Sequence, residues 1–205
     1  MRVAVLFSGG KDSVFAVFWA LTQGFTPVLV TVRPPDYSMM FHHPNIDLTT
    51  EQAKVMKLEQ VFVETTEDNW EEKLTALFKK LTINGIVTGA IESEYQRRRI
   101  DAIGEELSIP TYAPLWHKDA VLAEMLEYFE IYVTAVSAEG LGPEFLGEPL
   151  KKLVNSKKPG IHPFLEGGEG ETFVTNTPFF KDKIKIKEWK KSWDGIRGIA
   201  LGFKT

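Results

Sequence analysis

Residues 3–13 read Val-Ala-Val-Leu-Phe-Ser-Gly-Gly-Lys-Asp-Ser, and this stretch decides the fold. Its first five residues are apolar and rich in β-branched and aromatic types, which is the pattern of a short buried strand. Beyond residue 13, apolar side chains recur at helical spacing as far as Leu21, and Gly24 suits the position that ends a helix. The stretch therefore predicts a strand, a glycine turn and an amphipathic helix in direct succession.

The turn itself, Ser8-Gly9-Gly10-Lys11-Asp12-Ser13, has the composition of a phosphate-binding loop. The glycines permit a sharp turn, so that main-chain N–H groups point to a ligand at the start of the helix, where the helix dipole is positive. Lys11 adds a full charge, and the two serines add hydroxyl donors. Asp12 is a candidate metal ligand, although an acidic residue in a first helical turn also interacts favourably with the dipole. The alternative interpretation is an ordinary glycine-rich turn between a strand and a helix.

The next hundred residues alternate between apolar runs and helical periodicity. They predict strands at 27–32, 60–64, 85–90 and 110–115, and helices at 49–58, 70–81 and 94–107. Such alternation is typical of an α/β fold with a doubly wound parallel sheet. Ligands of these sheets bind at the carboxyl ends of the strands, where the strand order reverses. We therefore expect one crevice formed by residues 8–13, the irregular segment 34–47 and the pair Gly89-Ala90.

From about residue 119 the pattern changes. We expect a helix at 119–128, a strand at 131–136, a stretch through 170 that glycine and proline interrupt, and strand-like alternation near 179–193. This part is interpreted as a second, smaller α/β lobe. The expected domains are residues 1–118, which bind a nucleotide, and residues 119–205, which bind a substrate.

The 205-residue chain has 24 basic and 28 acidic side chains, a formal charge of −4. This acidic balance disfavours nucleic acid as a partner, because a protein that binds nucleic acid is expected to have a basic surface. Cysteine is absent, which excludes disulfides, iron–sulfur clusters and thiolate or persulfide chemistry. No apolar run reaches the roughly 18–20 residues that span a bilayer, and the first residues lack a signal-like pattern. We therefore expect a cytoplasmic protein with no membrane partner.

The loop at 8–13 differs from the G-x-x-x-x-G-K-[ST] phosphate loop, because Lys11 directly follows the glycine pair. It resembles the PP-loop of the ATP pyrophosphatases, which split ATP between its α and β phosphates. The resemblance implies an adenine nucleotide alpha-hydrolase-like fold of the HUP type. It also implies ATP and Mg²⁺ as cofactors and adenylation of an acceptor oxygen, after which a nucleophile displaces AMP.

Four further segments narrow this resemblance. They are SMMFHHPN at 38–45, GAIESEYQRRRI at 89–100, LWHKD at 115–119 with the later pairs Gly140-Leu141 and Leu146-Gly147, and EGGEGETF at 166–173. Together with the first loop, they closely resemble the diphthine–ammonia ligases, the archaeal and eukaryotic N-type ATP pyrophosphatases. The resemblance covers residues 1 to about 187.

The resemblance implies a reaction in which ATP, ammonia and diphthine on translation elongation factor 2 give diphthamide, AMP and pyrophosphate. Diphthine is a modified histidine that carries a carboxylate and a trimethylammonium group. The implied partners are therefore the diphthine-modified elongation factor and free ammonia or ammonium. The oligomeric state stays open, a homodimer included.

The chemistry of the loop, the strand ends of the expected sheet and the resemblance together indicate candidate site residues. Lys11, Asp12 and Ser13 are expected to be catalytic, and Asp12 is the expected metal ligand. The residues expected to bind ATP are Ser8, Gly9, Gly10, Lys11, Asp12 and Ser13, with Val30, Thr31, Gly89 and Ala90 near the adenine. The residues expected to bind the substrate are His42, Asn45, Tyr95, Gln96, Arg97, Glu166, Gly167, Gly168, Glu169, Glu171 and Thr172.

The chain departs from the family pattern at two positions. Gly170 stands where an aromatic residue usually precedes Glu-Thr, and Leu165 stands where glycine commonly precedes the first glutamate. The acidic segment at 166–171 can also be interpreted as a solvated turn. Two other functions therefore stay open, namely adenylation of a different acceptor, such as a tRNA base or a small metabolite, and binding of ATP without turnover.

Overall fold

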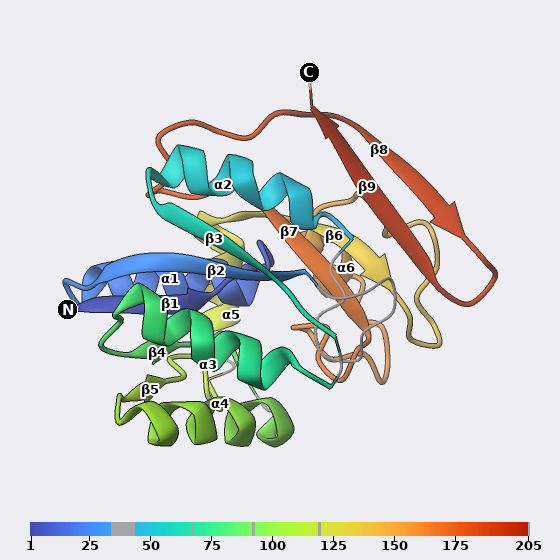
Figure 1. Ribbon diagram of the computed structural model, residues 1–205. Coiled ribbons are helices and arrows are strands. Elements are labelled where there is room, and N and C mark those ends of the chain that lie inside the picture. The colour runs from blue at the N-terminus through green and yellow to red at the C-terminus, as the bar shows by residue number, and fades with distance from the viewer. Residues whose placement is uncertain (34–43, 67, 92, 119, 205) are drawn as a thin grey trace. The chain divides into compact units, whose positions relative to one another are not determined.

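The computed structural model describes residues 1–33, 44–66, 68–91, 93–118 and 120–204 (Figure 1). Contacts divide the chain into two compact units. Unit 1 comprises Met1–Ser8, Asp12–His42 and Lys57–Lys118, and unit 2 comprises Gly9–Lys11, His43–Met56 and Asp119–Thr205. The glycine loop at 8–13 therefore contributes residues to both units.

Unit 1 contains a five-stranded parallel sheet with the strand order β3-β2-β1-β4-β5. The strands are β1 (Arg2–Leu6), β2 (Thr26–Arg33), β3 (Glu59–Glu64), β4 (Ile86–Val87) and β5 (Thr111–Tyr112). The chain runs outward from β1 to β3 and then returns to the other side of β1 for β4. The strand order thus reverses between β1 and β4, which is where ligands bind in sheets of this kind.

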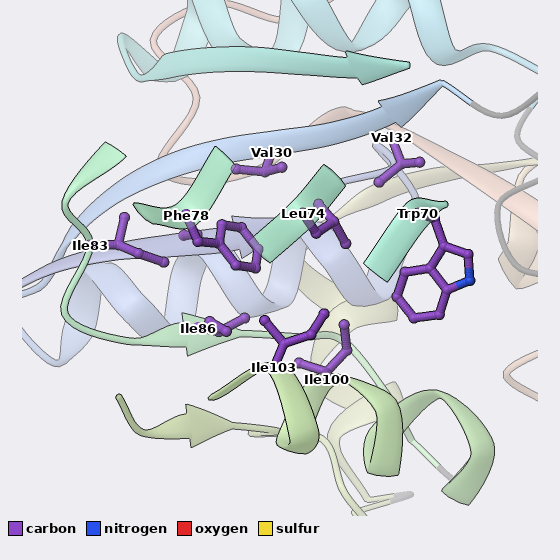
Figure 2. Packing of buried hydrophobic residues seen from close by; sticks show 10 residues of the cluster. Val30, Val32, Trp70, Leu74, Phe78, Ile83, Ile86, Ile100 and Ile103 are labelled. Carbon is purple, nitrogen blue, oxygen red and sulfur yellow. The ribbon is translucent and has the colours of Figure 1, made fainter. Parts of the chain in front are cut away.

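Both faces of this sheet are covered by helices, namely α1 (Lys11–Thr22), α3 (Trp70–Leu81) and α4 (Glu94–Leu107). One face carries a hydrophobic cluster to which α3 and α4 contribute, as Figure 2 shows; its members include Ala4, Val30, Leu74, Phe78, Ile86, Ile100 and Ile103. Successive side chains of a strand point to opposite faces, so Val3 and Val5 point away from Ala4, toward the face on which α1 lies (Figure 1). The arrangement confirms the predicted doubly wound α/β fold.

Unit 2 contains a four-stranded antiparallel sheet with the order β7-β6-β9-β8. Its strands are β6 (Glu130–Val136), β7 (Gly170–Asn176), β8 (Ile186–Trp193) and β9 (Gly198–Lys204), and its helices are α2 (Thr49–Met56), α5 (Val121–Tyr128), α6 (Leu150–Asn155) and the 3₁₀ turn η1 (Ile46–Leu48). The ring of Trp189 lies 5.5 Å from that of Tyr132. Gly147 lies against the same tryptophan, where a Cβ atom would come within 2.7 Å of it. A second, smaller sheet with its own helices is therefore present in addition to the doubly wound one.

Most predicted elements are found close to their expected bounds. The helices at 70–81 and 94–107 match α3 and α4, and Gly24 follows α1 with a positive φ of 71°. The elements that were not predicted are α6, β7, β9 and the 3₁₀ turn η1, and β7 begins inside the acidic segment at Gly170. The predicted strands at 85–90 and 110–115 are reduced to two residues each in β4 and β5.

The two domains expected at 1–118 and 119–205 remain a prediction. Unit 2 adds Gly9–Lys11 and His43–Met56 to the C-terminal residues. Among the residues that the structure describes, no helix combines the length and the hydropathy needed to cross a membrane.

Candidate functional site

In unit 1, the end of β4 lies against the beginning of α1. A Cβ atom on Gly89 would come within 2.7 Å of the carbonyl carbon of Asp12 and 3.0 Å of the amide nitrogen of Ser13. Only a residue without a side chain fits here, because these neighbours are backbone atoms that cannot move aside cheaply. The first turn of α1 therefore lies at the point where the strand order reverses, next to Gly89.

The two serines of the loop face each other, since the Oγ atoms of Ser8 and Ser13 lie 3.3 Å apart. Asp12 lies in the first turn of α1, where its negative charge interacts favourably with the positive end of the helix dipole. Ala90, after Gly89, donates its N–H to the hydroxyl of Thr88 at 3.2 Å. Unit 1 thus places two serine hydroxyls together at the N-terminus of α1, whose first turn also contains Asp12.

Lys11 is held within unit 2, where it is only 3% exposed. Its Nζ lies 3.9 Å from Oε1 of Glu166 and 5.3 Å from the centre of the Phe164 ring. A buried ammonium group requires an anion or an equivalent partner to offset the loss of hydration. The first glutamate of the acidic segment meets this need in the present structure.

The main chain of the loop is also held within unit 2. The N–H of Lys11 donates to Oγ1 of Thr172 at 3.1 Å, and the N–H of Val174 donates to the carbonyl of Gly9 at 3.1 Å. Gln52, on α2, donates from Nε2 to the same carbonyl at 2.9 Å. The structure therefore brings together loop residues and acidic-segment residues that lie more than 150 positions apart in the sequence.

The acidic segment has a compact conformation of its own. The carboxylate of Glu169 accepts the N–H of His162 at 2.8 Å, and the hydroxyl of Ser137 donates to the carbonyl of Gly168. Gly167 and Gly168 both have positive φ angles, which glycine adopts at no steric cost. From Gly170 onward, through Glu171 and Thr172, the chain is part of β7. These contacts make it an ordered turn that leads into a strand.

The two departures from the family pattern are neighbours in space. Leu165 has a φ of 59°, in the region that favours glycine, and its side chain is buried. A Cβ atom on Gly170 would come within 3.2 Å of Leu165 Cδ1 and 2.5 Å of the carbonyl oxygen of Ala135. An aromatic side chain at position 170 does not fit this conformation, in which Leu165 occupies part of the space.

Several predicted site residues have other partners in this structure. Asn45 forms two hydrogen bonds of 2.9 Å with the backbone of β9, from Nδ2 to Ala200 and from the N–H of Gly202 to Oδ1. Val30 is fully buried, and the hydroxyl of Thr31 donates to the carbonyl of Phe7 at 2.8 Å. Their predicted roles in substrate and adenine binding stay predictions. His42 lies outside the described residues, as do residues 34–41 of the segment that contains it.

The expected substrate residues on α4 lie in unit 1. The guanidinium of Arg97 lies 4.4 Å from the centre of the Trp116 ring and 3.5 Å from the carboxylate of Asp101. The backbone N–H of Gln96 donates to the hydroxyl of Ser93, which caps the helix, and Tyr95 is 56% exposed. A role in binding a phosphate or carboxylate remains a prediction for these three.

The described residues contain no group of three or more histidine, aspartate or glutamate side chains that could hold a metal ion. Mg²⁺ usually takes one or two protein carboxylates and completes its shell with phosphates and water. The oxygen groups that the loop offers, the Asp12 carboxylate and the hydroxyls of Ser8 and Ser13, are of the hard type that Mg²⁺ prefers. The donor chemistry therefore fits a metal ion brought with a nucleotide and offers no separate protein cage.

Sequence reasoning missed two residues of this site, Gln52 and Phe164. A single glutamine on an amphipathic helix carries no motif, and its burial depends on contacts with Gly9 and Val174. Phe164 precedes the acidic segment in a stretch that was expected to be irregular. Phe164 stands two residues before Glu166, and both side chains lie near Lys11. This closeness in the sequence is the signal that could have identified Phe164.

A parallel doubly wound sheet with a Gly-Gly-Lys loop at its switch point defines the class of α/β proteins that bind phosphate-bearing ligands at a helix N-terminus. The family models narrow this class. The diphthamide synthase N-terminal domain matches residues 1–111, and the diphthamide synthase C-terminal domain matches residues 117–204. The chain belongs to the diphthamide synthase family.

Curated relatives agree with this assignment. A protein of Bos taurus named diphthine–ammonia ligase is 34% identical over 222 residues, which cover 91% of this chain and 83% of the relative. The Homo sapiens protein of the same name is 33% identical, and the aligned region again covers 91% of this chain and 83% of the relative. A solved structure described as a predicted subunit of a tRNA methyltransferase from Methanocaldococcus jannaschii has a TM-score of 0.49 at 18% identity, covering 87% of this chain and 98% of its own.

Proposed function

We propose that this chain is an ATP-dependent diphthine–ammonia ligase. The carboxylate of diphthine displaces pyrophosphate from the α-phosphorus of ATP and becomes an acyl-adenylate. Ammonia then attacks the acyl carbon, AMP leaves, and diphthamide is formed with loss of a proton. Family membership over nearly the whole chain is the observation that carries this proposal.

The loop at 8–13 is proposed to bind the β and γ phosphates of ATP. The N-terminus of α1 offers positive partial charge, and Lys11 offers a full charge to offset that of the leaving pyrophosphate. The hydroxyls of Ser8 and Ser13 are proposed donors to the same phosphates. Gly89 supports this arrangement, because its missing side chain allows the first turn of α1 to approach β4.

Asp12 is proposed as the protein ligand of Mg²⁺, which would enter with ATP. A bound Mg²⁺ ion would supply further charge neutralisation on the phosphates. The hydroxyls of Ser8 and Ser13 lie close enough to each other to act on the same group.

The acidic segment at 166–171, with Thr172 directly after it, is proposed to act on the substrate side. Glu166, Glu169 and Glu171 carry the negative charge that a trimethylammonium group or an ammonium ion requires. Thr172 already links this segment to the loop through the N–H of Lys11. The proposed protein substrate is diphthine-modified elongation factor 2, with free ammonia as the nitrogen donor.

The deciding experiment uses ATP labelled in its α-phosphate, diphthine-bearing elongation factor 2 and ammonium. We expect labelled AMP and a mass change of the modified histidine from carboxylate to amide, both dependent on ammonium. Labelled ADP, or AMP formation without any change of the elongation factor, would contradict the proposal. A cytoplasmic location and a homodimer remain predictions, which cell fractionation and light scattering would test.

A further inference from the structure

Gln52 is a fully buried polar side chain on α2, with none of its surface exposed. Its Nε2 group donates two hydrogen bonds, to the carbonyl of Gly9 at 2.9 Å and to the carbonyl of Val174 at 2.8 Å. All three residues belong to unit 2. One side chain thus connects the glycine loop with β7, the strand that begins inside the acidic segment.

Two main-chain N–H groups form further hydrogen bonds between the same two segments. The N–H of Val174 reaches the carbonyl of Gly9, and the N–H of Lys11 reaches the hydroxyl of Thr172. The loop is therefore attached to β7 at residues 9 and 11, and Gln52 joins the same two segments from the α2 side. A displacement of the loop must break these bonds or carry β7 with it.

The fit around Gln52 is close. A Cβ atom on Gly9 would lie 2.4 Å from its Oε1 and 3.2 Å from the ring of Phe173. Among the residues that the structure describes, Oε1 itself has no hydrogen-bond partner. Leaving a buried acceptor unpaired costs stability, so stability alone is a poor reason for an amide at this position.

We propose that Gln52 is a positioning residue for the phosphate-binding loop. By holding the carbonyl of Gly9, it sets the backbone conformation in which the loop receives the phosphates of ATP, and it links that conformation to the acidic segment through β7. The inference rests on the proposed function only in taking residues 8–13 as the phosphate loop.

The test uses two variants and one matched control. Gln52→Met keeps the length of the side chain and removes both donors. Gln52→Glu keeps the shape but, when ionised, places a carboxylate against two carbonyl oxygens; protonation restores one donor. Gln23→Met makes the same chemical change at an exposed glutamine after α1. Thermal unfolding first establishes which variants are folded.

The readouts are the affinity for a non-hydrolysable ATP analogue, KM for ATP and KM for ammonium. In Gln52→Met we expect the analogue to bind about tenfold more weakly and KM for ATP to rise in proportion, with KM for ammonium unchanged. In Gln52→Glu we expect analogue affinity relative to the parent chain to recover as the pH falls from about 8 to about 6, because burial favours the protonated acid. Gln23→Met should match the parent chain.

A folded Gln52→Met variant with unchanged analogue affinity would overturn the proposal, because Gln52 would then serve packing alone. If that variant does not fold, the pH dependence of Gln52→Glu decides, and a constant ratio to the parent chain would overturn it. The analogue assay needs no elongation factor. A parent chain that binds the analogue without amidating diphthine would therefore contradict the proposed function. The role of Gln52 would still be decided by the analogue affinities of its variants.

Discussion

The ammonium nitrogen of Lys11 lies 3.9 Å from Oε1 of Glu166, and the side chain of Lys11 is 4% exposed. The pair joins the loop that is proposed to bind phosphate with the segment that is proposed to bind substrate. A phosphate group and the Glu166 carboxylate are both anions that suit this lysine. We therefore expect Lys11 to pair with Glu166 in the free protein and with a phosphate group in the nucleotide-bound protein.

Replacement of Glu166 by glutamine tests this competition. Because Glu166→Gln removes the anion that offsets Lys11, we expect a non-hydrolysable ATP analogue to bind about fivefold tighter, roughly 1 kcal/mol. Isothermal titration at low ionic strength measures the change. Glu139→Gln removes one charge from an exposed position of the same unit and should leave the affinity unaltered. Weaker binding to Glu166→Gln would show that this carboxylate assists the nucleotide instead of competing with it.

Replacement of Lys11 should remove turnover. Lys11→Met keeps most of the buried volume and deletes the charge, so the developing charge on pyrophosphate loses a stabilising partner. We expect kcat for AMP formation to fall by about 10²-fold or more. Lys73→Met, at an exposed position of α3, provides the control in the same pyrophosphate-release assay. Full activity of the Lys11 variant is the result that the mechanism does not allow.

Gly89→Ala should disturb the first turn of α1. The added Cβ atom would come within 2.7 Å of the Asp12 carbonyl carbon, so the helix start must shift. We expect a loss of about 1–3 kcal/mol in the free energy of unfolding and weaker binding of the ATP analogue. At Gly85 the nearest atoms lie at 3.2 Å or more, so Gly85→Ala should have a smaller effect. Urea denaturation compares the two, and equal losses would refute the role given to Gly89.

Gly170→Ala tests the packing of the acidic segment on β6. The new Cβ atom would lie 2.5 Å from the carbonyl oxygen of Ala135 and close to Leu165. We expect destabilisation by about 1–3 kcal/mol, because the contacted atom is backbone. Gly167→Ala adds a methyl group where no atom lies within 4 Å, so its cost should reflect only the positive φ, about 1 kcal/mol. Thermal unfolding of both variants provides the comparison.

The ion pair of Glu130 and Lys183 predicts a pH dependence of stability. Burial acts to raise the pKa of Glu130, but hydrogen bonds from Lys183 and Asn176 outweigh it and hold the pKa below its usual 4.5. The hydrogen bond to Glu130 raises the pKa of Lys183 above its usual 10.5. The pair therefore stabilises the fold fully between these two usual values. Its contribution is lost as the pH falls through the lowered pKa or rises through the raised one.

Glu130→Gln should accordingly lower the free energy of unfolding by at most about 1 kcal/mol at neutral pH, because both side chains are more than a third exposed and solvent screens the pair. The difference from the parent chain should vanish in acid, below the pKa of Glu130 in the folded protein. Urea denaturation at several pH values measures it, with the exposed Glu127→Gln as control. A difference that persists in acid would assign the effect to packing.

Much of the fold follows from local patterns. The helix at 70–81 was predictable because Trp70, Leu74 and Phe78 recur at helical spacing, and all three are buried. β7 was missed because Gly170 and Glu171 belong to a glycine-rich acidic run, which locally favours a turn. They pair with β6 all the same, at Val136 and Ala135, so long-range hydrogen bonds overrode the local preference.

The candidate site, like the fold, could be predicted from the sequence only in part. The loop at 8–13 could be recognised because its chemistry lies in six consecutive residues. Asn45 was predicted to bind substrate, yet in the structure it pairs with the backbone of β9. Nothing in the neighbourhood of Asn45 in the sequence indicates a partner 155 residues away.

The amino-acid order alone determined the alternation of strands and helices, the phosphate loop and the family, because each depends on residue types at short spacing. Only the tertiary structure decided that Gly9–Lys11 would be held by Gln52, Thr172 and Glu166. Those contacts depend on which distant segments the sheets bring together, and an amide, hydroxyl or carboxylate acquires its partner only when the chain has folded.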